Sequence, residues 1–330
     1  MNCNNRSDVV ARLCSSLSND VGEDPIGSSP TWDHCLFIEV STPWMPEVAL
    51  SENFPAGVSE SLKIATETGT NVRLQVFQPD PEYTKENHRR ILFYSRPYDL
   101  FSKYNKLEFV APDDQIGDLV QSILCSRDNL YKFDMYLQDT HQIRDLFVCT
   151  HGSRDVCCGS LGYPIFEILK NRYACEVDAS LRVWRTSHTG GHRLAPNIID
   201  MPEGRYWCRI GPDSLETLIN RDLSPSVIRS HYRGWAGIKT PVEQVAEREI
   251  LIREGWEWTG FLKNSRVISE TNDKTNVVQI DFMNPGTDRL VSYQAIVCVQ
   301  GSVIKANCMM PSIGAETIPQ YTVSNLSKII

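Results

Sequence analysis

The chain has 330 residues, of which 41% are hydrophobic and 22% are charged. These values are near globular averages, so they exclude a collagen-like chain, a disordered tail and a coiled coil. A chain of this length predicts about two domains, with enough buried surface to fold without disulfides or metal. Lys and Arg total 33 and Asp and Glu total 41, so the formal net charge is −8. This acidic balance argues against sequence-independent binding to nucleic acid, which needs a basic surface.

The apolar runs are short. The segments CLFIEV at 35–40 and AIVCV at 295–299 fall far below the ~20 residues of a membrane span. The opening residues MNCNNRSDVVARLC contain no apolar h-region, so we expect no secretory signal. The 11 cysteines are scattered, which favours reduced thiols or metal ligands over a disulfide framework. We therefore expect a cytoplasmic protein that binds neither membrane nor nucleic acid.

Hydrophobic periodicity predicts the same order of elements in two parts of the chain. Residues 1–30 are polar and predict an irregular lead-in. The first part then predicts a strand at 35–41, a helix at 54–67, strands at 72–77, 90–95 and 107–111, and a helix at 113–125. The second part predicts a strand at 145–151, a helix at 163–173, strands at 180–186, 197–200 and 205–210, and a helix at 213–220. This repeated order has two interpretations: the chain contains two copies of one α/β unit, or the two parts are similar only because α/β chains generally look alike.

A further helix and several strands follow. Thr240 is a good N-cap, with Pro241 at the first helical position and Glu243 three residues after the cap, so the pattern predicts a helix over 240–254. Beyond it the sequence predicts strands at 277–282, 290–299 and 303–308, with a turn at 300–301.

Two segments contain the cysteines and histidines that are the best candidates for metal ligands. The first, CTHGSRDVCCG at 149–159, places thiols at the end of a strand and in the loop before a helix. A helix N-terminus favours a thiolate there. The second, SHTGGHR at 187–193, places His188 and His192 around a Gly–Gly pair, which predicts a loop with the backbone close to a bound group. Two thiolates and two imidazoles suit tetrahedral zinc, or a two-iron cluster with cysteine on one iron and histidine on the other. The spacing alone leaves this choice open.

The remaining cysteines and histidines have simpler interpretations. A buried cysteine is usually a small hydrophobe, which we expect of Cys35, Cys125, Cys175, Cys208, Cys298 and Cys308. Cys3 lies in a segment that we expect to be mobile. We expect structural or surface roles for His34, His88, His141 and His231, because no ligand spacing surrounds them. The adjacent Cys157 and Cys158 suggest dithiol chemistry only weakly, since a thioredoxin-type site has C-x-x-C.

The two segments together resemble the sucrase/ferredoxin-like family of thioredoxin-like iron–sulfur proteins. Further segments resemble family signatures in the expected order, namely CSSLSNDVGEDPIGSSP near the start, HYRGWAGI at 231–238 and PVEQVAEREILIREGW at 241–256. The resemblance covers roughly residues 12–260. It implies a 2Fe–2S cluster ligated by two cysteines and two histidines, which fall here on Cys149, Cys158, His188 and His192. Cys157 departs from the family pattern, and His151 is a reserve ligand.

The resemblance implies a thioredoxin-like ferredoxin domain, which we place at residues 141–264 of an α/β fold. The order of elements predicts an α/β region without metal ligands at residues 1–140, which is either a degenerate copy of the same unit or only generally similar to it. The same order predicts a β-rich extension at residues 265–330.

The implied function is transfer of one electron to and from an unidentified redox partner protein. Neutral imidazoles carry less negative charge than thiolates, so we expect a higher potential than that of an all-cysteine cluster, coupled to pH. The rival hypotheses are a structural zinc protein and a thiol-dependent reductase using Cys157 and Cys158. Asp155 and Arg193 are the nearest candidates to orient the imidazoles. Sugar hydrolysis needs two positioned carboxylates, and no acidic pair stands out.

Overall fold

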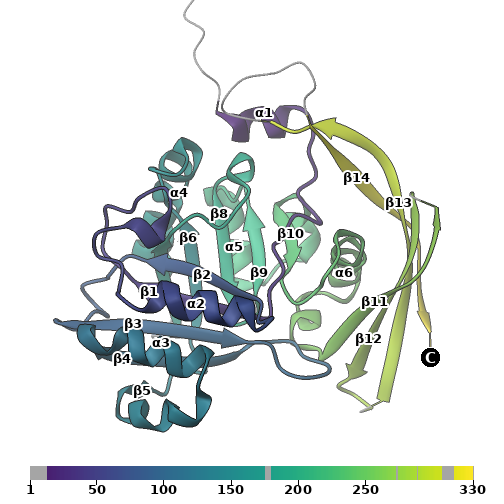
Figure 1. Ribbon diagram of the computed structural model, residues 1–330. Coiled ribbons are helices and arrows are strands. Elements are labelled where there is room, and N and C mark those ends of the chain that lie inside the picture. Colours follow the sequence, from purple (N-terminus) through teal and green to yellow (C-terminus); the bar gives the residue numbers. More distant parts are fainter. Residues whose placement is uncertain (1–12, 175–179, 273, 288, 307–315, 330) are drawn as a thin grey trace, which may run out of the picture.

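The computed structural model describes residues 13–174, 180–272, 274–287, 289–306 and 316–329. These residues form a ten-stranded mixed sheet covered by helices and a separate four-stranded antiparallel sheet (Figure 1). The predicted α/β fold class is therefore confirmed. Cys3, Cys175 and Cys308, whose roles were predicted from the sequence, lie outside the described residues.

The first half of the large sheet follows the predicted order of elements. In chain order these are β1 (His34–Glu39), α2 (Val58–Glu67), β2 (Val72–Phe77), β3 (His88–Ser95), β4 (Asn105–Pro112) and α3 (Ile116–Leu124). A short strand that was not predicted, β5 (Leu137–Gln138), follows them. Strand β1 runs parallel to β2 and antiparallel to β3, and β3 runs antiparallel to β4. The resulting strand order is β2-β1-β3-β4-β5.

The second half has the same arrangement. Its elements are β6 (Arg144–Cys149), α4 (Val156–Ile168), β7 (Leu181–Thr186), β8 (Asn197–Met201), β9 (Arg205–Cys208), α5 (Pro212–Asn220) and β10 (Tyr232–Trp235). Strand β6 runs parallel to β7 and antiparallel to β8, and β8 runs antiparallel to β9. The strand order β7-β6-β8-β9 thus repeats the strand order β2-β1-β3-β4, and the corresponding strands run in the same relative directions. Two copies of one α/β unit would have this topology.

The two halves meet along β2 and β7. These strands pair antiparallel through Phe77 and Thr186, and the amide of Ser187 donates to the carbonyl of Val76 at 2.8 Å. Aromatic side chains add a second contact, since the rings of Phe37 on β1 and Phe147 on β6 stack with centroids 3.9 Å apart. The halves therefore share one sheet and one buried aromatic cluster.

Helix α6 (Pro241–Glu254) lies between the large sheet and the small one (Figure 1). Its predicted capping box is confirmed: Thr240 Oγ1 accepts from the Glu243 amide at 3.3 Å, and the Glu243 carboxylate accepts from the Thr240 amide at 2.9 Å. The small sheet consists of β11 (Lys263–Asn272), β12 (Thr275–Asn284), β13 (Arg289–Ile304) and β14 (Thr317–Ile329). Buried residues of β12 and β13, such as Ile280 and Tyr293, join the core beneath α6.

Three sequence expectations for the chain ends were wrong. The predicted turn at 300–301 is a β-bulge, because β13 continues through it while pairing with β14. Strands β11 and β14 were not predicted, since polar residues dominate both and each lies at an edge of its sheet. The lead-in is not wholly irregular, because α1 (Cys14–Asp20) forms within it.

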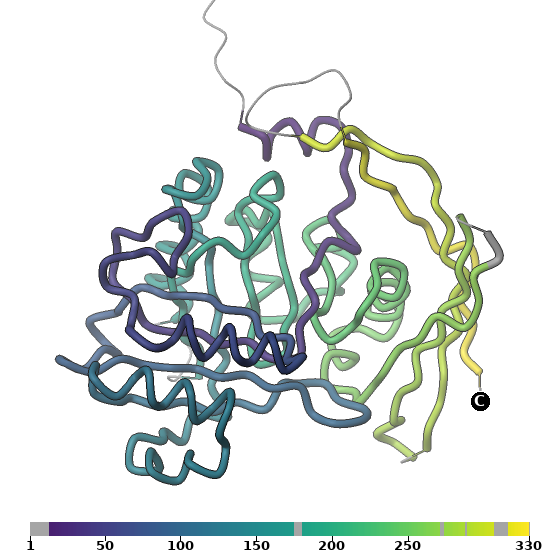
Figure 2. Tube along the Cα trace, viewed as in Figure 1, coloured from purple at the N-terminus to yellow at the C-terminus, as the bar shows by residue number. Residues whose placement is uncertain are grey.

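After α1 the chain runs beside β10 before it enters β1 (Figure 2). The amides of Gly27 and Ser29 both donate to the carbonyl of Arg233, at 3.0 and 3.3 Å. Asp24 also pairs with Arg248 of α6 at 2.7 Å. These contacts fix the N-terminal segment against the second half.

The burial predicted for the other cysteines is confirmed only in part. Cys35 and Cys208 are fully buried, and Cys298 is half-buried. The prediction was wrong for Cys125, which is exposed because it follows the last turn of α3, where that helix ends at the surface.

A buried carboxylate connects the strands of both halves. Asp145 on β6 is fully buried and accepts hydrogen bonds from Arg182 Nε at 2.8 Å and Trp184 Nε1 at 2.8 Å, both on β7. It also accepts from Tyr94 on β3 at 2.9 Å and from Lys106 on β4 at 2.6 Å. Burial alone would raise the pKa of Asp145, but Arg182 and Lys106 outweigh it and lower this pKa to about 2.

Replacing this carboxylate tests the network. We expect Asp145→Asn to lower the free energy of unfolding by about 3 kcal/mol at neutral pH, because the buried cations Arg182 and Lys106 each lose one of two carboxylate partners and keep only Glu108. The Asp145 pKa is lowered by folding, so its stabilisation is present above about pH 4 and is lost as the pH falls toward 2. Urea unfolding at pH 7 and at acid pH measures both effects.

The matched control is Asp139→Asn, which alters an exposed ion pair with His141. We expect the control to change the free energy of unfolding by no more than about 0.5 kcal/mol. An equally small change for Asp145→Asn would contradict a structural role for the network.

Candidate metal centre

The candidate ligands gather at one edge of the second half-sheet. Strands β6 and β7 are parallel, with Cys149 paired with Thr186 as the last residue of each. Their carboxyl ends therefore meet at the same edge, where the 150–155 and 187–191 loops begin. This is where open α/β sheets usually bind ligands.

Helix α4 brings two more thiols to this edge. Asp155 is its N-cap and accepts from the Cys157 amide at 2.9 Å, so Cys157 and Cys158 lie in the first turn. Gly162 allows the helix to approach β6 closely, because a side chain there would overlap the carbonyl oxygen of Cys149. Gly162 thus allows α4 to place its two thiols beside the end of β6.

Three of the four predicted ligands come together. One ligating atom each from Cys149, Cys158 and His188 lies within 4.8 Å of the others. Cys158 Sγ is 3.3 Å from His188 Nδ1, both thiols are fully buried, and His188 is half-buried. The pKa of the Cys149 thiol is held well below its usual range, because Cys158 and His188 donate hydrogen bonds to it. Cys158 keeps its proton in this pair, so its own pKa is raised.

The fourth predicted ligand, His192, lies beside this group and not within it. Its ring centroid is 6.2 Å from that of His188. His192 Nδ1 is 2.9 Å from Asp155 Oδ2 and 3.1 Å from Cys14 Sγ. Burial lowers the pKa of His192, and the Asp155 carboxylate opposes that shift.

Cys14 is the residue that the sequence analysis missed. It begins α1 and lies 3.2 Å, Sγ to Sγ, from Cys157. Cys14, Asp155 and Cys157 form a second group with ligating atoms within 4.8 Å of one another. The available signal was the position of Cys14 at the start of CSSLSNDVGEDPIGSSP, the segment that resembles a family signature.

His151, the reserve ligand, is engaged in hydrogen bonds at both ring nitrogens. Its Nδ1 accepts from the His188 amide at 3.2 Å. Nε2 therefore carries the proton and donates to the carbonyl of Met45 at 3.0 Å. His151 thus positions the backbone of His188 and links this loop to the end of β1.

Two arginines hold the loop that carries both imidazoles. Arg233 donates to the carbonyl of Gly190 at 2.9 Å, and Arg73 donates to that of Thr189 at 2.8 Å. Gly191 has φ of +73°, and a side chain there would meet the Arg233 guanidinium at 2.9 Å. Arg233, from the HYRGWAGI segment, therefore supports the loop that carries the histidine pair. Arg193 pairs instead with Glu23 at 2.7 Å.

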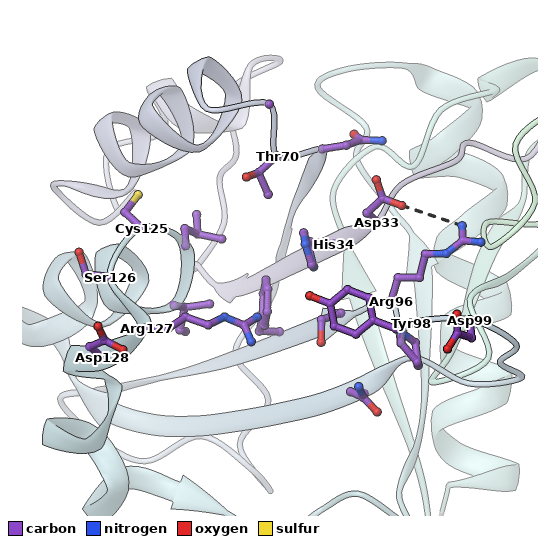
Figure 3. A pocket seen from close by; sticks show the side chains of 18 of the residues that line it. Asp33, His34, Thr70, Arg96, Tyr98, Asp99, Cys125, Ser126, Arg127 and Asp128 are labelled. Atoms are coloured by element: carbon purple, nitrogen blue, oxygen red, sulfur yellow. Dashed lines mark ion pairs between the residues drawn. The ribbon is translucent and has the colours of Figure 1, made fainter.

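The group opens toward a hollow of about 410 Å³. His188 and His151 line it together with Glu47, Arg154 and Ser187. A wider hollow of about 1090 Å³ lies elsewhere, at the amino end of β1 (Figure 3). Its lining includes Asp33 and Arg96, which pair at 3.9 Å, and it contains none of the candidate ligands.

Comparison with known proteins identifies the family of the chain. The model of the sucrase/ferredoxin-like family matches residues 25–234, more than half of the chain. The chain belongs to the sucrase/ferredoxin-like family. The match spans both halves of the large sheet and includes both loops of the candidate centre. No solved structure matches the chain.

Two curated relatives bear the name "Altered inheritance of mitochondria protein 32". The protein from Meyerozyma guilliermondii is 29% identical over 96 residues, which are 27% of this chain and 34% of the relative. The protein from Eremothecium gossypii is 28% identical over 102 residues, which are 27% of this chain and 31% of the relative. The similarity thus spans about a third of each relative. Among the described residues, no helix is long and apolar enough to cross a membrane.

Asp155 offers a direct test of how α4 begins. We expect Asp155→Ala to lower the free energy of unfolding by about 1 kcal/mol, because the Cys157 amide loses its acceptor. Asp155→Asn keeps an acceptor oxygen, so its stability should stay close to that of the parent chain. Urea unfolding of both variants measures the difference, and equal stabilities would contradict the cap.

Proposed function

We propose that this chain is an iron–sulfur redox protein that carries one electron at a 2Fe–2S cluster. Its ligands are Cys149, Cys158, His188 and His192. The observation that carries the proposal is the grouping of Cys149, Cys158 and His188 within 4.8 Å, from three separate segments, at the edge where β6 and β7 end. His192 follows four residues after His188, with the two ring centroids 6.2 Å apart.

The donor set fits such a cluster. Cys149 is favoured as a thiolate, and thiolates and neutral imidazoles are the ligands of two-iron centres with mixed ligation. When bound, the cluster supplies a one-electron couple. The chain itself orients the imidazoles: His151 holds the His188 amide, while Arg233 and Arg73 hold the loop carbonyls.

The electron partner docks, in this proposal, over the hollow beside His188. Arg154 and Glu47 line this hollow, so it presents one positive and one negative side chain to a partner. The formal net charge of −8 favours a partner with a basic docking surface. No nucleic acid or membrane takes part.

The rival functions have weaker support. A structural zinc ion would use the same donors, but it would be colourless and redox-silent. A thiol-dependent reductase would need Cys157 and Cys158 to act as one dithiol, but they are neighbours in the first turn of α4 and belong to different ligand groups. Sugar hydrolysis needs two carboxylates, and Asp155 is the one carboxylate in the two described ligand groups.

The compartment is a separate question. The sequence predicts a cytoplasmic location, whereas the name of the two relatives refers to inheritance of mitochondria. We propose that the protein works in a reducing compartment, where its thiols remain available as ligands. Fractionation of cells that express the tagged chain would distinguish cytoplasm from mitochondria.

Metal analysis of the anaerobically purified protein tests the cluster. We expect about two irons and two acid-labile sulfides per chain in a coloured solution. Cys149→Ser, Cys158→Ser and His188→Ala should each lose most of the iron. Cys208→Ser is the matched control, because Cys208 is also buried but lies outside both ligand groups. One zinc and no sulfide after expression with ample iron would overturn the proposal in favour of the zinc protein.

The potential tests the histidine ligands. We expect His188→Cys to lower the midpoint potential by on the order of 100 mV, because an anionic thiolate replaces a neutral imidazole and disfavours reduction. The variant should also lose part of the pH dependence that ligating imidazoles give. Redox titration over a pH series measures both. An unchanged potential and pH profile would mean that His188 is not a ligand.

A further inference from the structure

A second pair of thiols lies next to the candidate ligands. Cys14 begins α1 and Cys157 lies in the first turn of α4, 143 residues further along the chain. Their Sγ atoms are 3.2 Å apart, and both side chains are fully buried. Neither belongs to the ligand set proposed above, so this pair is not explained by the cluster.

The pair has nearly the spacing of a disulfide. An S–S bond is about 2.05 Å long, so the two sulfur atoms need to approach by only about 1 Å. Cys158 is a poor partner for Cys157. Consecutive Cα atoms are about 3.8 Å apart, below the range of about 4.4–6.8 Å that disulfides span. Neighbouring residues of a helix also do not face each other.

The surroundings give small reagents a route to the pair. Cys14 Sγ is 3.1 Å from His192 Nδ1, and the His192 side chain is 32% exposed. Both thiols belong to a small buried apolar cluster with Ala195. Movement of the His192 side chain would open Cys14 Sγ to solvent.

We propose that Cys14 and Cys157 form a reversible disulfide, a two-electron couple distinct from the proposed cluster. The oxidant is a low-molecular-weight disulfide such as oxidised glutathione. One protein thiolate attacks its S–S bond and releases one reagent thiol, leaving a mixed disulfide. The second protein thiolate then attacks the protein sulfur of that mixed disulfide and releases the other reagent thiol. Two protein thiols are thus oxidised to one disulfide, and the reagent gains two electrons and two protons.

The bond would fasten α1 over the loop that carries His192. α1 already contacts this region, since Ser15 Oγ donates to the carbonyl of Ala195 at 2.5 Å. A cross-link between residues so far apart also restricts the unfolded chain strongly. The oxidised protein should therefore unfold at a higher temperature and hold His192 more firmly in place.

Peptide mapping tests the bond. The anaerobically purified full chain is equilibrated with mixtures of oxidised and reduced glutathione, and its thiols are then alkylated and digested without reductant. We expect the Cys14 peptide joined to the Cys157 peptide, with a two-electron dependence on the glutathione ratio. Three results would overturn the proposal: no linked peptide, glutathione held stably on one thiol, or Cys157 joined to a ligand cysteine.

Variants and a second readout complete the test. Cys14→Ser and Cys157→Ser should each lose the linked peptide and the rise in unfolding temperature on oxidation. Cys35→Ser, at a buried cysteine outside both groups, should keep both. Iron content is measured in parallel. A linked peptide in protein that holds no iron would support the disulfide while overturning the cluster, and iron without a linked peptide would do the reverse.

Discussion

The structure depends on a buried carboxylate that joins its two halves. Asp145 accepts hydrogen bonds from β7 of its own half and from β3 and β4 of the other half. Arg182 extends the network by donating to Glu108 at 2.7 and 2.9 Å. A buried charge with these partners strongly disfavours any shift of β6 against β7, because a shift would leave charges unpaired in the core. Cys149 lies four residues after Asp145 along the same strand, so the network also sets where the candidate centre forms.

The two halves share a topology but differ in the segments that follow their parallel strands. Both have parallel strands whose carboxyl ends meet, but β1 leads into the segment VSTPWM, whereas β6 leads into the thiol loop. The first-half segment covers the second-half loop. The Trp44 ring lies against that of His151, and the Trp44 carbonyl accepts from Ser153 at 2.6 Å. The second half thus holds the candidate ligands, and the first half covers the loop that begins after Cys149.

The proposed cluster and the proposed disulfide would place two kinds of electron carrier within one small region. Asp155 connects the two groups. It caps the helix that bears Cys157 and Cys158, and it pairs with His192. His192 contacts Cys14 of the second group while its loop carries His188 of the first. A covalent change at Cys14 would therefore act first on a proposed ligand.

Local patterns in the sequence determined most of the secondary structure and its order along the chain. Strand alternation, the Thr240 capping box and the repeated order of elements all depend on near neighbours in the chain, and the structure has them. The motif at 149–159 and the histidine pair also identified the family. Only the tertiary structure decided that Cys14 faces Cys157, that both nitrogens of His151 are engaged, and that Arg233 supports the histidine loop. These contacts join residues between 37 and 143 positions apart, and no local periodicity encodes them. They arise from the packing of α1, β1 and β10 around the ends of β6 and β7.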